Sequence, residues 1–410
     1  MSDTIRMNSP YFHKARLRAL SEYAKEQLRC QNFAGIAWSL EHCGEIVSED
    51  YLGFTDHALS QRVGGDTLYR LYSMTKPVIS VRCLQLLEQG RLRLDDPISR
   101  WIPAFSQQRV LCANGSLEPL NRPITVEDLL THRSGLSYDF LMNCPVAALY
   151  REKDLAGDGA RSLKELVEQL ALLPLASQPG SRWYYSYATD VLAHLIECIT
   201  ERSIADNLKS SLFEPLNMTD TGFFVNHKDQ HRVADMFGQK ELGDVDSGDC
   251  AGNDLLAMSV EPSYPMAENT GFSRGGIGLF STMSDYQRFM PVLMHGNTED
   301  GVPLLSKPTV DMLWENRLSD SQMPIKIGDR AYHGYGWGLT GRVMADSASA
   351  SLVCVPGEGG WAGAASTYFW IDRQNSVSGI VMAQYLGSAI ALGPDMQSLA
   401  YSAFCNRLPS

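Results

Sequence analysis

The sequence predicts an α+β fold, with one antiparallel sheet built from both ends of the chain, flanked by helices, and a mostly helical lobe inserted between those ends. Strand-like runs lie near the N-terminus, alternating aromatic-rich runs lie near the C-terminus, and helical spacing dominates the region between them. The 410 residues exceed what a single core usually holds. We therefore expect an α/β domain of residues 1–70 and 285–410 and a mostly helical domain of residues 71–284.

The N-terminal region predicts a helix followed by two strands. In the stretch YFHKARLRALSEYAKEQLRC, apolar residues recur at the spacing of an amphipathic helix, at Leu17, Leu20, Tyr23, Ala24 and Leu28. The next stretch, FAGIAWSLEHCGEIVSEDYLGFTD, has two strand-like runs around a polar turn at residues 42–44. This end of the chain therefore supplies a flanking helix and part of the sheet.

The middle and the C-terminal region predict helices and then a meander. Residues 73–200 have mostly helical spacing, whereas residues 226–268 are polar, rich in Asp, Gly and Asn, and predict a long irregular segment. The stretch STMSDYQRFMPVLMHG predicts a helix capped by Thr282 or Ser284. The runs HGYGWGLTGRVM, AASTYFWIDR and VSGIVMAQYL predict strands of one antiparallel meander, and a last helix is expected over residues 394–405.

Composition and charge argue against several classes of protein. The formal net charge is -12 and there is no block of Lys and Arg, so neither a nucleic acid nor a membrane is expected as a partner. No apolar run approaches the ~18 residues of a membrane span, and no signal peptide is predicted. The 9 cysteines lack paired spacing, which predicts reduced thiols in a cytoplasmic protein. We expect no cofactor and no metal, since His227 and His231 have i,i+4 spacing but lack a third ligand.

Two signatures of a nucleophilic serine compete. The stretch GFSRG, residues 271–275, matches G-x-S-x-G, and the stretch YSMTKP, residues 72–77, contains S-x-x-K. A nucleophile elbow at Ser273 needs a buried strand before the serine and a helix after it. The preceding stretch EPSYPMAENT contains two prolines, and the following stretch GGIGLFS is glycine-rich. We expect these glycines instead to let the backbone pass close to another element.

The alternative nucleophile, Ser73, has a better local context. Residues 77–89 predict a helix with Pro77 in its first turn and Gly90 as its C-cap. Ser73 then lies at the helix N-terminus, and Lys76, three residues later, shares its face. The helix dipole favours an oxyanion that forms at Ser73, and a desolvated lysine can lose its proton and act as a base. The sequence therefore favours Ser73 over Ser273.

Further segments accompany this motif. The stretch RWYYSYATDVLAHLIE places Tyr185 just before a helix, and GEGGWAGAASTYFWIDR places a glycine-rich turn, residues 359–363, against a strand. Together with LDDPISRWIP, TVEDLLTHRSGLSY, LFEPLNMTDTGFFV and GGIGLFSTMSDYQRF, these segments resemble the serine β-lactamase superfamily: class C β-lactamases, D,D-peptidases and, most closely, family VIII carboxylesterases. The resemblance covers residues 15–405 in family order. It implies that the active site lies at the interface of the two predicted domains.

The resemblance also implies roles for individual residues. Ser73 corresponds to the nucleophile, Lys76 to the base that takes its proton, and Tyr185 to the residue that shares this proton network and protonates the leaving group. The oxyanion hole corresponds to the backbone N–H groups of Ser73 and Ala364. Whether Lys76 or Tyr185 is deprotonated at rest stays open, because such coupled groups titrate together.

Three positions depart from the β-lactamase pattern. Residues 361–363 align with the K-T-G box, where Trp361 replaces the lysine, Ala362 replaces the threonine, and Gly363 matches. Tyr187 stands where class C enzymes have asparagine. The donors for the carboxylate and acylamino groups of a β-lactam are thus missing, and we expect Tyr187, Trp361 and Gly363 to contact a different substrate. The resemblance implies a serine hydrolase that cleaves short-chain carboxylic esters through an acyl-enzyme, with a small-molecule ester as its substrate. A β-lactamase, a D-amino-acid peptidase or amidase, and an acyltransferase stay as alternatives.

Other chemistry-bearing residues have simpler explanations. His132 is predicted to be a structural residue, because Lys76 already supplies a base. The stretch DVDSGD, residues 244–249, predicts a solvated loop, since its glycine is misplaced for a calcium site. The aromatic residues around the motifs either form core or line an apolar substrate pocket; they are Trp183, Tyr184, Tyr187, Tyr335, Trp337 and Trp361.

Overall fold

The computed structural model describes residues 10–157, 159–238, 255–267 and 271–405. Its centre is a seven-stranded antiparallel sheet with the order β11-β12-β13-β14-β15-β1-β2. Strand β1 pairs with β15, with Trp38 opposite Val381, so the sheet joins the two ends of the chain. The predicted α+β fold is confirmed. The strands of the sheet are β1 Gly35–His42, β2 Glu45–Gly53, β11 Tyr335–Trp337, β12 Arg342–Met344, β13 Gly359–Gly363, β14 Thr367–Asp372 and β15 Val377–Met382.

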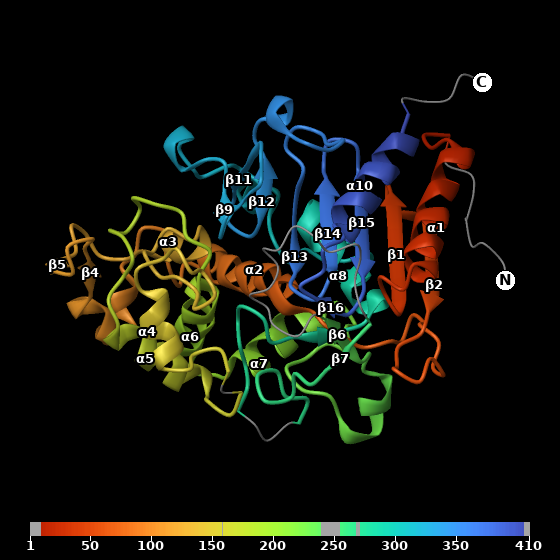
Figure 1. Ribbon diagram of the computed structural model, residues 1–410. Coiled ribbons are helices and arrows are strands. Elements are labelled where there is room, and N and C mark those ends of the chain that lie inside the picture. Colours follow the sequence, from red (N-terminus) through yellow and green to blue (C-terminus); the bar gives the residue numbers. More distant parts are fainter. Residues whose placement is uncertain (1–9, 158, 239–254, 268–270, 406–410) are drawn as a thin grey trace.

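Helices cover both faces of the sheet (Figure 1). Helices α1 Lys14–Arg29 and α10 Leu392–Ala403 lie side by side on one face, and α8 Met283–His295 packs on the other. Successive side chains of a strand point to opposite faces, so each strand feeds two cores. Trp38 packs in the core with α1 and α10, whereas its neighbour Ala37 joins the core on the α8 side.

The flanking helices form where the sequence predicts them. Helix α1 buries Leu17, Leu20 and Ala24 from its apolar stripe. The N-cap of α8 is Thr282 rather than Ser284, because Thr282 Oγ1 accepts a hydrogen bond from the backbone N–H of Asp285 at 3.1 Å. The predicted hairpin of β1 and β2 is also present, with its turn at residues 43–44.

The helical lobe is arranged around α2 Thr75–Glu88, whose side chains are almost all buried. Helix α2 runs from the sheet into a group of shorter helices (Figure 1). One hydrophobic core extends from α2 to the sheet, since Val81 of α2, Leu195 of the lobe and Phe369 of β14 belong to the same cluster. The division into domains at residues 70 and 285 stays a prediction. The shorter helices are α3 Val126–Leu130, α4 Ala147–Glu152, α5 Leu163–Leu172, α6 Ala188–Thr200 and α7 Ile204–Leu208, and α9 Lys307–Leu313 follows α8.

Nine short strands outside the central sheet, each too short to show an alternating pattern in the sequence, complete the described part of the fold. Within the predicted irregular segment, β6 pairs with β7 and with β16 near the C-terminus. Strands β6 and β7 were not predicted, because two or three residues are too few to show an alternation. Residues 244–249, the predicted solvated loop, lie outside the described residues. These short strands are β3 Tyr69–Arg70, β4 Arg109–Leu111, β5 Leu117–Pro119, β6 Met236–Gly238, β7 Ala257–Met258, β8 Phe280–Ser281, β9 Lys326–Ile327, β10 Arg330–Ala331 and β16 Tyr385–Leu386.

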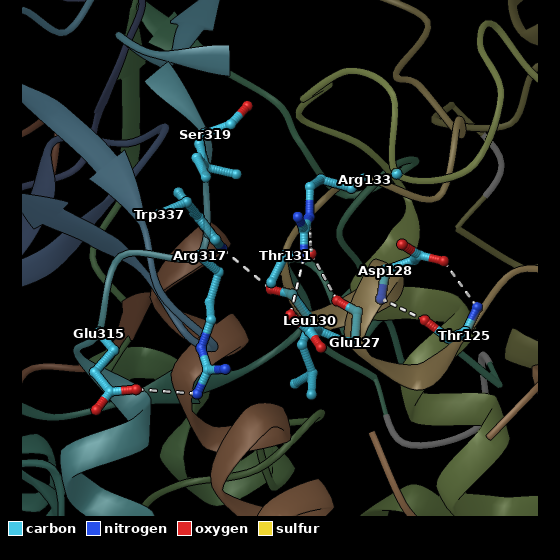
Figure 2. Close-up of polar contacts among 12 residues, drawn as sticks. Thr125, Glu127, Asp128, Leu130, Thr131, Arg133, Glu315, Arg317, Ser319 and Trp337 are labelled. Carbon is cyan, nitrogen blue, oxygen red and sulfur yellow. Dashed lines mark hydrogen bonds and ion pairs between the residues drawn. The ribbon is translucent and has the colours of Figure 1, made fainter. Parts of the chain in front are cut away.

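Helix α3 links the lobe to the edge of the sheet (Figure 2). Thr125 Oγ1 accepts from the N–H of Asp128 at 3.2 Å, and the Asp128 carboxylate accepts from the N–H of Thr125 at 2.9 Å, which forms a capping box. At the other end of α3, the indole N–H of Trp337 on β11 donates to the carbonyl of Leu130 at 3.1 Å (Figure 2). These bonds fix the position of the chain that follows α3.

Two further properties concern the helices and the cysteines that the structure describes. Among the helices that the structure describes, none has both the length and the apolar character that crossing a membrane requires. The cysteines at eight positions within the described ranges are free thiols, and two of them, Cys30 and Cys43, are exposed. The reduced state of the cysteines stays a prediction.

Candidate active site

Ser73 lies in a single 3-10 turn, Tyr72–Met74, that leads directly into α2. Its side chain is buried. The preceding residue, Tyr72, has a φ of 47°, in the left-handed region that non-glycine residues rarely adopt. The Tyr72 ring packs edge-on against Tyr264, with 5.0 Å between ring centroids, which holds this conformation. Such backbone strain concentrates at functional sites, so the turn is a candidate for one.

Lys76 extends from the first turn of α2 back toward Ser73. Its Nζ atom donates hydrogen bonds to Ser73 Oγ at 3.1 Å, to Tyr138 OH at 3.2 Å and to the carbonyl of Gly276 at 2.9 Å. The side chain is 1% exposed. All three of these acceptors are neutral, so none of them offsets the loss of hydration of the ammonium by a full negative charge.

The Tyr185 hydroxyl completes the cluster around the serine. It donates to Ser73 Oγ at 2.6 Å and accepts from the indole Nε1 of Trp361 at 2.9 Å. Lys76 Nζ also lies 4.5 Å from the centroid of the Tyr185 ring. The fold thus brings Ser73 from the start of α2, Tyr185 from the segment before α6, and Trp361 from β13 to one point.

Burial sets the protonation states of this cluster. It lowers the pKa of Lys76 to about 7, although the carboxylate of Asp190 acts in the opposite direction. Burial also raises the pKa of Tyr185 above its usual value, more than the hydrogen bonds with Ser73 and Trp361 lower it. At neutral pH a large fraction of Lys76 is therefore the neutral amine, while Tyr185 keeps its proton. Of the two residues, Lys76 is the one suited to accept the proton of Ser73.

The end of β13 passes close to the serine turn. A Cβ atom on Gly363 would lie 2.3 Å from the carbonyl oxygen of Leu71 and 2.2 Å from Thr367 Oγ1, so only glycine fits there. Thr367 Oγ1 itself donates to the Leu71 carbonyl at 3.1 Å. Ala364 directly follows Gly363, so its backbone lies next to this contact. The oxyanion hole formed by the N–H groups of Ser73 and Ala364 stays a prediction.

Comparison with known proteins identifies the family. Residues 20–396 match the family model described as Beta-lactamase. The chain belongs to the beta-lactamase family. Protein Rv1367c of Mycobacterium tuberculosis (strain ATCC 25618 / H37Rv) is 34% identical over 345 residues, which cover 82% of this chain and 81% of that protein. Esterase EstB of Burkholderia gladioli is 29% identical over 378 residues, which cover 90% and 89%.

A solved structure shows that the fold is shared as well. EstCE1, described as a hydrolase with promiscuous acyltransferase activity, has a TM-score of 0.77 to this chain at 21% identity, covering 95% of this chain and 97% of that one. The predicted resemblance to the serine β-lactamase superfamily and its esterases is therefore confirmed.

The residues that depart from the β-lactamase pattern are engaged within the protein. Trp361 is 3% exposed and donates its indole N–H to Tyr185. Tyr187, the N-cap residue of α6, is also buried and donates its hydroxyl to Asp139 Oδ1 at 3.0 Å. In this beta-lactamase-family chain, both side chains therefore support neighbouring residues. Their predicted contacts with substrate, and that of Gly363, stay predictions.

An aromatic cluster buries Tyr185. Its ring centroid lies 5.3 Å from that of Trp361, 6.2 Å from Trp183 and 6.3 Å from Trp337. All three tryptophans are buried, and Tyr184 is half-buried. Of the two interpretations of these aromatic residues, the core interpretation fits the three tryptophans. These tryptophans surround Tyr185 with apolar side chains, in agreement with the burial that raises the pKa of Tyr185.

Among the hydrogen bonds of the described residues, none joins His132, His227 or His231 to Ser73, Lys76 or Tyr185. His132 is buried, and its Nδ1 lies 3.0 Å from Ser186 Oγ. Burial, followed by the nearby charge of Lys76, lowers its pKa well below the usual value, so it stays neutral. Its ring lies 5.0 Å from that of Tyr185, in agreement with the predicted structural role. His227 and His231 lie in the 3-10 turn His227–Arg232, and within the described ranges no group of three or more His, Cys, Asp or Glu side chains is arranged to hold a metal ion.

The competing serine, Ser273, has no elbow around it. Residues 271–279 form neither a strand nor a helix before β8 begins. A Cβ atom on Gly275 would lie 2.5 Å from the carbonyl of Thr189, and one on Gly276 would lie 2.6 Å from Asp190 Oδ2. The predicted close approach of this glycine-rich backbone to another element is confirmed, and that element is α6.

The sequence interpretation missed three groups that touch the lysine network. These are the hydroxyl of Tyr138 and the carbonyl of Gly276, which both bind Lys76, and the carboxylate of Asp190. Asp190 is 2% exposed and accepts from the N–H of Gly276 at 3.1 Å. Burial raises its pKa, whereas the Gly276 N–H and the charge of Lys76 lower it. The sequence signal for Asp190 is an acidic residue on an otherwise apolar helix face, five residues after Tyr185.

Proposed function

We propose that this protein is a serine hydrolase that cleaves short-chain carboxylic esters through an acyl-enzyme on Ser73. The observation that carries the proposal is the pair of hydrogen bonds on Ser73 Oγ, one with Lys76 at 3.1 Å and one with Tyr185 at 2.6 Å. A serine hydroxyl is a weak nucleophile at neutral pH and needs an adjacent base. The name of Esterase EstB, which aligns with 90% of this chain, supports the same class of reaction.

In the proposed acylation step, the neutral amine of Lys76 takes the proton of Ser73 while Oγ attacks the ester carbonyl. The oxygen that becomes negative is stabilised by the backbone N–H groups of Ser73 and Ala364. Tyr185, which keeps its proton at neutral pH, protonates the leaving alkoxide and is reprotonated by Lys76. In deacylation a water molecule takes the position of the alcohol, and the same groups act in reverse.

The absence of the side chains that recognise a β-lactam in other family members supports the ester assignment. Trp361 stands at the position of a cation and Tyr187 at that of an amide donor. Trp361 donates a hydrogen bond to Tyr185, and Tyr187 donates one to Asp139. Arg274 donates to the carbonyl of Ser162 at 3.1 Å and lies over the ring of Phe272, so its guanidinium is engaged at the start of α5. Each charge-assisted hydrogen bond that a β-lactam loses costs about 1.5–3 kcal/mol of binding free energy. An apolar ester has neither the carboxylate nor the acylamino group that needs such a bond.

A chromogenic panel tests this proposal against its alternatives on the same nucleophile. We expect kcat/KM for p-nitrophenyl butyrate to exceed that for nitrocefin and for D-alanyl-p-nitroanilide by at least ~100-fold. Comparable efficiency on nitrocefin would indicate a β-lactamase, and on the anilide a D-amino-acid peptidase or amidase. If added short-chain alcohols take most of the acyl group in competition with water, the protein is an acyltransferase.

A further inference from the structure

A second cluster of reactive side chains lies on α6, apart from the site around Ser73. It consists of His194, Glu197 and Cys198, whose i, i+3 and i+4 spacing puts them on one face of the helix. His194 Nδ1 lies 2.9 Å from Glu197 Oε2, and His194 Nε2 lies 3.7 Å from Cys198 Sγ. Glu197 is itself held in place, because its Oε1 accepts from the backbone N–H of Ile204 at 2.9 Å.

In this arrangement the thiol of Cys198 faces the imidazole of His194, and the carboxylate of Glu197 orients that imidazole, as in a catalytic triad. Because Glu197 binds Nδ1, the other ring nitrogen, Nε2, is the one that faces the thiol of Cys198. Burial opposes a charge on His194, but the hydrogen bonds with Cys198 and Glu197 outweigh it and raise the pKa of His194 to about 9. An imidazolium is the form of histidine that stabilises a neighbouring thiolate.

The cluster opens into a groove large enough for a small peptide-like molecule. The groove has a volume of about 600 Å³ and lies between α5, α6 and the segment before residue 105. Its base is apolar, with Ile102 and Val167 buried. Its rim carries both signs of charge, which suits a zwitterionic ligand: Lys164, Glu168, Glu201 and Arg202. Ser73 is not among its lining residues.

The position of Cys198 within a helix decides between two kinds of thiol chemistry. Acyl transfer needs backbone N–H donors for an oxyanion, and the N–H groups inside a helix are already bonded to carbonyls one turn earlier. Disulfide exchange needs only a thiolate and access. We propose that Cys198 is a modification site for small-molecule disulfides of the glutathione type, which the groove admits and His194 activates.

The exchange balances without any further reactant. In the imidazolium–thiolate pair the proton of Cys198 is held by His194 Nε2, and the thiolate attacks one sulfur of the disulfide. A new S–S bond forms at Cys198, the original S–S bond breaks, and the departing thiolate takes the proton back from His194. Cys198 is oxidised and the released half of the disulfide is reduced. Within the described residues, no second cysteine lines the groove, so the mixed disulfide persists until an external thiol removes it.

The wild-type protein contains its own comparison thiol. Cys30 is exposed, but its Sγ lies 3.2 Å from Glu26 Oε1, and this hydrogen bond raises the pKa of the Cys30 thiol. The folded full-length protein is incubated with oxidised glutathione, and peptide mass spectrometry follows each cysteine over time. We expect Cys198 to be modified at least ~10-fold faster than Cys30, although Cys30 is the more exposed. If Cys30 reacts as fast or faster, the proposal is overturned.

Two variants test the role of the neighbours. His194→Gln should slow modification of Cys198 about 10-fold while leaving the rate at Cys30 unchanged, because only the Cys198 thiolate loses an imidazolium partner. Glu197→Gln should slow it by a smaller factor. A Cys198 rate in His194→Gln equal to that of the wild type, at an unchanged melting temperature, would overturn the proposal. The comparison of Cys198 with Cys30 in the wild type decides it independently of how the variants fold.

Discussion

Lys76 carries its amine inside the protein, among three neutral hydrogen-bond acceptors. Desolvation penalises the ammonium there, and a base is most effective when its pKa lies near the working pH. Asp190 limits the shift, because its carboxylate favours the charged form of Lys76. A buried acid near the lysine therefore tunes the base to a pKa of about 7 rather than lower.

The pH dependence of ester hydrolysis should report this lysine. Lys76 must be neutral to accept the proton of Ser73, so kcat/KM for p-nitrophenyl butyrate should rise as the pH increases through about 7 and then level off. Tyr185 adds no falling limb below about pH 9, because burial raises its pKa above the usual value. A profile measured between about pH 5 and pH 9 checks this. A half-maximal pH of 9 or above would show that Lys76 is not the resting base.

Trp361 holds the hydroxyl of Tyr185, and this gives a prediction with a matched control. Trp361→Phe removes the indole N–H that donates to Tyr185 at 2.9 Å, so we expect kcat to fall about 10-fold with little change in KM. Trp337→Phe removes an indole N–H that donates to Leu130 instead, so it should lower the melting temperature and leave kcat close to that of the wild type. Equal kcat values for the two variants would contradict the positioning role of Trp361.

Among the elements, residues 359–363 were predicted incorrectly because of their glycines. A glycine-rich turn was expected, but the structure contains strand β13. The glycines are required by packing: a Cβ atom on Gly359 would lie 2.0 Å from the ring of Trp314, and one on Gly360 would lie 2.3 Å from the carbonyl of Phe369. In β13 the glycines thus mark close approach to neighbouring groups rather than a turn.

The contact between β13 and the serine turn can be tested by adding one methyl group. Gly363→Ala should lower the free energy of unfolding by about 1–3 kcal/mol and reduce ester hydrolysis, because the carbonyl of Leu71 occupies the space of the new Cβ. Gly222→Ala is the control, since its Cβ would meet only the carbonyl of Phe224 at an ordinary 3.7 Å. Denaturant unfolding measures both. Equal stability of the two variants would contradict the tight contact.

The elements that the sequence predicted correctly are those with a long, regular pattern. Helix α1, the hairpin of β1 and β2, and helix α8 each show one period over many residues. The motif S-x-x-K likewise places Ser73 and Lys76 within one helical turn. By contrast, Tyr138 and Gly276 reach Lys76 from positions 62 and 200 residues away in the sequence. Such long-range convergence has no local pattern, so it required the structure.

At the scale of the whole molecule, the serine lies where the sheet meets the helical lobe. Ser73 lies in the turn before α2 and Lys76 in the first turn of that helix, which runs from the sheet into the lobe (Figure 1). Helix α6 begins just after Tyr185, and strand β13 of the sheet contains Trp361. The bond from Trp337 to Leu130 joins the same two regions beside the aromatic cluster (Figure 2). The proposed catalytic geometry therefore depends on the packing of the two regions against each other.

In the proposed mechanism Ser73, rather than Ser273, forms the acyl-enzyme. The most direct measurement is to label the folded protein with a fluorophosphonate, map the modified residue by peptide mass spectrometry, and assay Ser73→Ala and Ser273→Ala on p-nitrophenyl butyrate. We predict a label on Ser73 alone, loss of ester hydrolysis in Ser73→Ala by a factor of at least ~1,000, and nearly full activity in Ser273→Ala. A label on Ser273, or full activity in Ser73→Ala, would contradict this account.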